Sequence, residues 1–193
     1  MGSNSWKNIQ TVPYWIPHHQ RPGVLSSGAS RWFGKMRDTY SSSVIISLDM
    51  SDEKFKVLQL PKEPLESRHT FLSIGELKGC LSVVVEVAKA RVEVWVMQDY
   101  RVEESWTKRY IITHERVLER TFHLQLMWGF ENDEMLFTFG GKLGVYDPKS
   151  GSFREPNTSI TLSLFGKCNY FESLVSLNSG TCVGGRTASS FTF

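Results

Sequence analysis

A histidine pair, His18 and His19, is the first group in the sequence that could bind a metal ion. A zinc site needs three or four imidazole, thiolate or carboxylate ligands at short spacing, and no cysteine or acidic residue stands at such a spacing here. Pro13, Pro17 and Pro22 surround the pair and favour a surface loop. The sequence therefore predicts no metal centre at this point.

Acidic and glycine-rich motifs elsewhere have explanations that are simpler than catalysis. Glu103 and Glu104 could serve acid–base chemistry, but neighbouring side chains on an extended chain point in opposite directions, so a solvated turn is favoured. The Gly-Gly-Lys run at 140–142 lacks the spacing of a phosphate-binding loop and is typical of a hairpin turn after Phe139. No Gly-x-Ser-x-Gly turn offers a nucleophile. The sequence predicts neither an enzyme nor a cofactor site.

Composition limits the partners and the compartment of the protein. Of its 193 residues, 22 are lysine or arginine and 20 are acidic, and this balance is too even to predict nucleic-acid binding. No apolar run is long enough to cross a bilayer, and the first residues do not resemble a signal peptide. Cys80, Cys168 and Cys182 lack metal-like spacing and fit a reducing compartment. We expect an intracellular protein, cytoplasmic or nuclear, with neither membrane nor nucleic acid as a partner.

The clearest secondary structure lies in 79–112, where the pattern predicts three successive strands. In the middle strand, 91–97, three valines alternate with Glu93, Trp95 and Met97, which is the period of a pleated strand. The Ala-Lys-Ala link at 88–90 is short enough for a tight antiparallel hairpin. This segment is predicted to be an antiparallel meander.

The meander recurs at a period of about fifty residues. Turns of small or acidic residues lead into Trp6, Phe55, Trp106 and Phe153, which are spaced by 49, 51 and 47 residues. Four-stranded units at this period are the sequence signature of β-propeller blades, which stack because one twisted meander cannot bury both of its faces. We therefore predict an all-β protein of antiparallel four-stranded blades, a partial kelch-like propeller of about three blades over 23–61, 71–112 and 122–153.

The remaining segments set the predicted domain boundaries. Residues 1–22 are predicted to be the remnant of a preceding blade, with Trp6 on its outer strand, followed by a Pro-rich loop over 11–22. Residues 23–177 form the predicted propeller-like domain. Residues 178–193 are rich in glycine, serine and threonine and are predicted to be a flexible tail.

Several segments resemble motifs of one plant protein family. Residues 23–32, GVLSSGASRW, resemble a blade opening "GV-x-x-x-GAL-x-W", and 45–61, from IISLDMSDEKF to LP, resemble "I-x-SFDL-x-x-EKF-x-x-x-x-LP". Residues 79–81, 92–97 and 104–108 are similar to "GCL…V-x-x-WVM-x-x-YGV-x-ESWTK". YDPK at 146–149 and YFESLV at 170–175 follow in the same order. Together these segments resemble the F-box-associated domain of plant F-box proteins.

The resemblance implies a kelch-like propeller that recruits substrate proteins to an SCF-type ubiquitin ligase. No stretch of these 193 residues resembles the F-box, the helical segment that docks on a Skp-type adaptor, so we do not expect adaptor binding. The resemblance implies the C-terminal half of such a protein and transfers no site residues. A standalone scaffold or competitor that binds protein partners without a ligase is the alternative.

Charge and aromatic residues indicate where a partner would bind. In a propeller, links between blades and between the second and third strands share one face. That predicted face carries His18, His19, Arg21, Lys35, Arg37, Arg68, Lys89, Arg91, Arg116 and Lys142. The opposite turns carry Asp49, Asp52, Glu53, Asp99, Glu103 and Glu104. Loops are often charged in any protein, and Glu63, Glu66 and Glu119 weaken the separation. We nevertheless hypothesise that the basic face meets an acidic partner protein, with Trp15 as an exposed contact.

Overall fold

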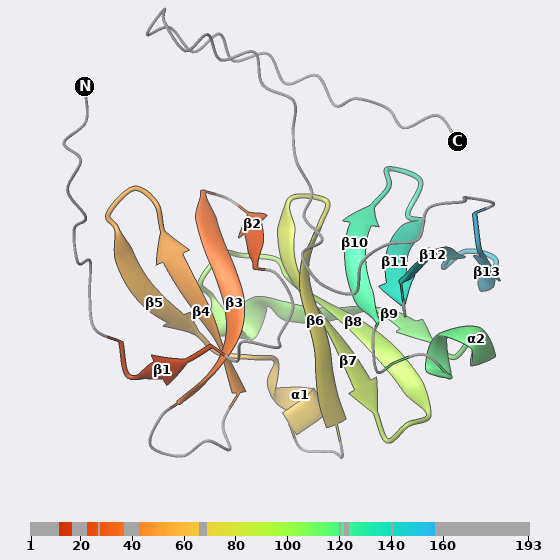
Figure 1. Ribbon diagram of the computed structural model, residues 1–193, viewed down its shortest axis with the longest axis horizontal. Coiled ribbons are helices and arrows are strands. Elements are labelled where there is room, and N and C mark those ends of the chain that lie inside the picture. The colour runs from red at the N-terminus through yellow and green to blue at the C-terminus, as the bar shows by residue number, and fades with distance from the viewer. Residues whose placement is uncertain are drawn as a thin grey trace, which may run out of the picture.

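The structure, a computed structural model, describes residues 12–16, 23–26, 28–36, 43–65, 69–119, 121, 124–139 and 141–156. Within them the chain is almost entirely β-structure (Figure 1). The strands are β1 (Tyr14–Trp15), β2 (Val24–Ser26), β3 (Ala29–Met36), β4 (Ser43–Asp49), β5 (Lys54–Leu58), β6 (His69–Leu77), β7 (Cys80–Val87), β8 (Arg91–Met97), β9 (Trp106–Ile112), β10 (Gln125–Gly129), β11 (Met135–Phe139), β12 (Lys142–Asp147) and β13 (Ser152–Arg154). The helical pieces are α1 (Lys62–Leu65), η1 (Glu103–Ser105) and α2 (Glu115–Leu118).

These strands form three antiparallel sheets, which we call blades 1, 2 and 3. Blade 2 has the order β6-β7-β8-β9 and blade 3 the order β10-β11-β12-β13. In blade 1, β1 and β2 pair with opposite ends of β3 and together complete the first strand beside β3, β4 and β5. The predicted all-β fold of three four-stranded antiparallel blades is therefore confirmed for the described residues.

One sequence prediction inside blade 1 was wrong. The prolines of 11–22 suggested a loop, but Tyr14 and Trp15 pair with Met36 and Lys35 as a short strand. The reason is that β3 is long enough for its far end to accept a second edge partner after β2 ends.

The blades stack face to face, and their sheet faces form two cores (Figure 1). In β8, the three valines lie in the core between blades 2 and 3, whereas Trp95 and Met97 lie in the core between blades 1 and 2. The alternation predicted from the sequence is thus confirmed, and both faces of the strand are buried. Burial of each such side chain stabilises the fold by roughly 1.5–3 kcal/mol, so blade stacking is a main source of stability.

The repeated aromatic residues occupy equivalent places in the three blades. Phe55, Trp106 and Phe153 are the first or second residue of the fourth strand in their blades. Their partners across the sheet, Leu48, Met97 and Tyr146, follow at equal intervals of 49 residues. Trp6, the first member of the predicted series, lies outside the described residues.

The hairpin turns depend on backbone conformations that favour glycine. The two-residue turn between β6 and β7 has positive φ at both Lys78 (51°) and Gly79 (80°), as a type I′ turn requires. The turn between β7 and β8 places Ala88 (φ 52°) and Lys89 (φ 56°) in the left-handed region without a glycine. The tight hairpin predicted for 88–90 is present, and it is strained.

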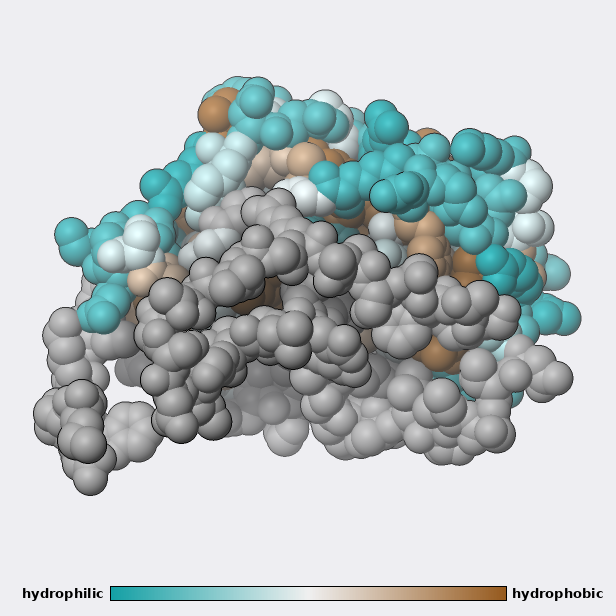
Figure 2. Space-filling view, turned by 90° about the horizontal axis from the view of Figure 1, so that it is seen from above, coloured by the Kyte–Doolittle hydropathy of each residue, from teal (hydrophilic) through white to brown (hydrophobic). Residues whose placement is uncertain are grey.

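The stacked blades leave their loops at two ends, which define two faces of the molecule (Figure 1). We call the lower one in that view the helix face, formed by β1, α1, the β7–β8 turn and α2. The other is the turn face, formed by the turns at 50–53, 78–79 and 130–134 and the loop 98–105. Seen from above, the described surface is mostly hydrophilic, with apolar side chains set between the blades (Figure 2). None of the helices in the described segments is long and apolar enough to span a membrane.

Candidate protein-binding face

Two of the predicted contact residues, Trp15 and Lys35, lie together on the helix face below blade 1. They are register partners in β1 and β3. The Trp15 side chain is 41% exposed, and the next residue, Ile16, is 38% exposed. An exposed indole beside a lysine can pack on an apolar group of a partner while the ammonium pairs with a carboxylate.

Lys89 and Arg91 lie below blade 2, at the turn between β7 and β8. Lys89 is exposed and makes no ion pair with any described residue. The guanidinium Nε of Arg91 instead donates a 2.7 Å hydrogen bond to the carboxylate of Glu93, whose side chain is buried. Arg91 therefore has a structural role, and Lys89 is the freer cation of this pair.

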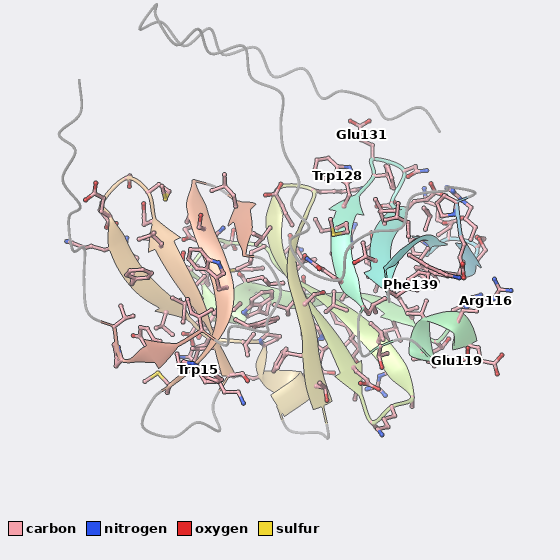
Figure 3. All side chains as sticks on the ribbon, viewed as in Figure 1. Trp15, Arg116, Glu119, Trp128, Glu131 and Phe139 are labelled. Atoms are coloured by element: carbon pink, nitrogen blue, oxygen red, sulfur yellow. The ribbon has the colours of Figure 1, made fainter. Side chains whose placement is uncertain are left out.

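Arg116 lies on α2, a helix that packs against β8 of blade 2. The one-turn helix is capped by His114, whose Nδ1 accepts a hydrogen bond from the backbone N–H of Arg116. The side chain of Arg116 is exposed and projects outward (Figure 3). Glu119 projects from the same end of the molecule, so the surface there is mixed in charge (Figure 3).

Lys142 begins β12 in blade 3 and is exposed. Its ammonium lies 3.7 Å from a carboxylate oxygen of Glu155, a weak surface ion pair. Of the predicted contact residues, Trp15 and Lys35 thus lie together and Lys89 and Arg91 share one turn, while Arg116 on α2 and Lys142 in blade 3 stand apart. His18, His19, Arg21, Arg37 and Arg68 lie outside the described residues.

The acidic residues predicted for the turn face are partly neutralised by neighbours that sequence reasoning did not pair with them. Asp49 accepts hydrogen bonds from Lys56 (3.0 Å) and Arg101 (2.7 Å). The pKa of Asp49 is held well below its usual range, chiefly by hydrogen bonds from Ser51 and Lys56. Asp52 also accepts a hydrogen bond from the ammonium group of Lys56, at 2.8 Å. The turn face is therefore less negative than the sequence pattern suggests.

Two buried charged groups between blades 1 and 2 were missed from the sequence. Glu93 is 1% exposed and accepts hydrogen bonds from Arg91 and, at 2.9 Å, from the indole of Trp95. Arg31 is 0% exposed. The sequence did contain a signal for both residues. Each is a charged residue at a position of an alternating strand that faces inward, where the other residues are mostly apolar.

Among the described residues, no group of three or more His, Cys, Asp or Glu side chains could hold a metal ion. Glu103 and Glu104 are exposed in η1, as predicted for a solvated turn, and Cys80 is half-buried against the core between blades 2 and 3.

Comparison with known families agrees with this arrangement. The sequence model of the F-box associated beta propeller domain matches residues 1–177. The chain belongs to this family. The motif resemblance of 23–177 is thereby confirmed, and the stacked blades are those of an F-box-associated domain.

Three relatives from Arabidopsis thaliana are F-box proteins by name. The F-box protein At3g07870 is 27% identical over 199 residues, which cover 91% of this chain and 47% of the relative. The F-box/kelch-repeat protein At3g23880 is 30% identical over 176 residues, 90% of this chain and 46% of the relative. The F-box protein CPR1 is 27% identical over 121 residues, 56% of this chain and 29% of the relative. This F-box-associated chain therefore spans about half the length of the first two relatives.

Proposed function

We propose that this F-box-associated domain recognises a protein substrate for an SCF-type ubiquitin ligase inside the cell and catalyses no reaction itself. The observation that carries the proposal is the family match over 1–177, together with relatives that are F-box proteins. Substrate recruitment is what the family resemblance implies, and a scaffold of stacked blades with free loop faces suits it.

The helix face supports this proposal and indicates the kind of partner. The facing sides of the three blades cover one another, and the loops at the two ends remain as surfaces available for binding. On the helix face, the exposed Trp15 and Ile16 offer apolar area, and Lys89 and Arg116 offer cations without a described partner. Aromatic anchors with nearby cations fit a partner that presents an apolar side chain flanked by acidic residues.

Affinity capture from plant cells tests the proposal, with the full chain compared against a Lys89→Glu and Arg116→Glu double variant. Arg91 is left unchanged, because its reversal would place a second carboxylate against buried Glu93. We expect the double variant to lose most of its captured partner, and the loss to be smaller at high salt, where charge attraction is screened. Lys149→Glu in blade 3 is the matched control and should capture as the wild type does, because Lys149 is also exposed.

The fate of the captured partner separates substrate recognition from simple scaffolding. If the partner is a substrate, its ubiquitination and turnover should fall when the domain is removed, and a Skp-type adaptor should be found in the same complex. If turnover does not change and no adaptor is found, the protein is a scaffold or competitor instead. Equal capture by the wild type and the double variant would exclude the helix face.

A further inference from the structure

Arg31 on β3 is buried between blades 1 and 2, and two of its three side-chain nitrogens make no hydrogen bond. It is 0% exposed, and no carboxylate among the described residues pairs with it. Its Nη1 donates to the backbone carbonyls of Ser26 and Ala29, the latter at 3.3 Å. Its Nε and Nη2 have no hydrogen-bond partner in the described structure. A buried cation with unmet donors is unfavourable, so a missing acceptor is indicated.

The two unused nitrogens form one edge of the guanidinium group. This edge carries two parallel N–H bonds, which can donate to both oxygens of one carboxylate in a bidentate pair. Two buried hydroxyls, Ser26 Oγ and Ser47 Oγ, also make no hydrogen bond of normal length and angle with a described residue. Ser47 is the register partner of Arg31, and Ser26 pairs with Ala29, so all three side chains face the same side of blade 1. The free donors therefore gather on one surface.

Tyr100 of blade 2 covers this surface from the turn face. Its ring lies 4.6 Å from the guanidinium carbon of Arg31 and 4.9 Å from that of Arg101. Burial raises the pKa of the Tyr100 hydroxyl, but polar contacts of its oxygen with Ser47, Arg101 and Arg31 outweigh that effect and lower it. The ring is 38% exposed, and it belongs to the loop 98–105 that projects from blade 2. Tyr100 thus occupies an electropositive position that favours an anion.

The buried carboxylate of the same interface shows how completely this fold can satisfy a charge. The carboxylate of Glu93 lies 2.7 Å from the guanidinium of Arg91, 2.9 Å from the indole nitrogen of Trp95 and 3.4 Å from the ammonium of Lys108. Arg31 receives no comparable partner. Asp49 pairs with Lys56 and with Arg101, whereas Arg31 pairs with no carboxylate among the described residues.

We propose that Arg31, Ser26, Ser47 and Arg101 form a carboxylate-binding site between blades 1 and 2, with Tyr100 as its removable cover, and that the site takes an acidic side chain of a protein partner. The inference rests on the proposed recognition function and places a second contact on the turn face. Displacement of Tyr100 exposes the guanidinium edge, which then binds the carboxylate side-on, while Arg101 remains at the rim.

The test uses the full 193-residue chain and its Tyr100→Ala variant, with the Arg31 Nε–H resonance followed by NMR. The probe is a Gly- and Ser-based peptide with one central glutamate, and the matched peptide has glutamine there. We expect the glutamate peptide to shift this resonance and to bind Tyr100→Ala at least tenfold more tightly than the wild type. The glutamine peptide should have no effect. Equal behaviour of the two peptides would overturn the proposal.

Sodium acetate separates the two sources of a carboxylate. If acetate binds as tightly as the glutamate peptide, the site holds a free small anion and the claim of a protein partner fails. If the resonance of the wild type already shows a bound carboxylate and neither probe competes, an acidic residue of the chain itself fills the site and the proposal also fails.

Second-site variants assign the binding to Arg31. Adding Arg31→Met to Tyr100→Ala should abolish binding, whereas adding Lys54→Met, which removes an exposed cation of blade 1, should not. If Arg31→Met does not fold, Arg31→Lys keeps the charge without the two-pronged edge and should weaken binding at least tenfold. If the Arg31 variants have no effect on binding but the Lys89→Glu and Arg116→Glu double variant still loses its partner, the carboxylate site is excluded. The proposed recognition function would then remain supported.

Discussion

The indole nitrogen of Trp106 donates a 3.0 Å hydrogen bond to the backbone carbonyl of Gln59, and so ties the fourth strand of blade 2 to the end of blade 1. The Trp106 ring is 8% exposed and belongs to the core between these blades. The aromatic residue that marks the sequence repeat therefore joins neighbouring blades through both packing and a hydrogen bond.

Substitution of Trp106 should separate these two contributions. Trp106→Phe removes the hydrogen bond and keeps most of the ring, so we expect a loss of about 1 kcal/mol in the free energy of unfolding. Trp106→Ala also leaves a cavity and should cost about 3–5 kcal/mol. Urea denaturation measures both, with Met50→Ala, a 60% exposed side chain, as the control near zero. Equal losses for both Trp106 variants would show that packing contributes little.

Much of the fold could be predicted because the strand alternation and the fifty-residue repeat both result from the need to bury the two faces of every blade. Each blade must bury both faces, so β8 alternates two sets of apolar side chains, and the aromatic residue at each blade corner recurs near a period of fifty. The β1 strand escaped prediction, because two residues carry no period and their pairing depends on the length of β3.

The candidate site was less predictable because charge pairing is a three-dimensional property. The sequence placed Arg91 among free cations, but the neighbouring Glu93 is turned inward and binds it. Lys56 and Arg101 come to Asp49 from different blades. Trp15 was correctly expected to be exposed, since a short segment among prolines seldom reaches a core.

Glu93 makes the stability of the domain depend on pH. Burial raises the pKa of its carboxyl, but hydrogen bonds from Arg91 and Trp95 and the charge of Lys108 outweigh burial and lower it below its ordinary 4.5. A lowered pKa in the folded state means that the stabilisation is fully present above pH 4.5 and is lost as the pH falls through the folded value. The wild type should thus lose stability in this acidic range.

The Glu93→Gln variant isolates this contribution from the other carboxylates. Glutamine keeps an acceptor for Trp95 but leaves Arg91 without its counter-charge, and because the side chain of Arg91 is 41% exposed we expect a loss of about 1–2 kcal/mol at pH 7. The difference from the wild type should shrink as the pH falls below 4.5. Denaturation at a series of pH values measures it. A difference that stays constant down to pH 3 would contradict the role assigned to the carboxylate charge.

Gly144 permits two phenylalanine rings to pack against β12. A Cβ atom at this position would lie 2.2 Å from the ring of Phe153 and 2.5 Å from that of Phe139, and these rings are 5.5 Å apart between centroids. Gly144→Ala should therefore destabilise the domain by about 1–3 kcal/mol through overpacking. Phe153→Leu in the same chain makes room, so the double variant should be more stable than the sum of the two single losses predicts. Additive losses in urea denaturation would rule out this steric conflict.

Trp15 should matter for binding and little for folding. Its ring is 41% exposed and its backbone pairing with Lys35 survives truncation, so Trp15→Ala should change the free energy of unfolding by no more than about 0.5 kcal/mol. If the indole is the anchor of the helix face, the same change should weaken partner capture about tenfold or more, since aromatic anchors carry roughly 2 kcal/mol in interfaces. Met50→Ala, which truncates an exposed apolar side chain on the turn face, is the matched control. Binding titrations of the wild type, Trp15→Ala and Met50→Ala against the captured partner measure this effect. Equal affinities of the wild type and Trp15→Ala would show that Trp15 is not part of the interface.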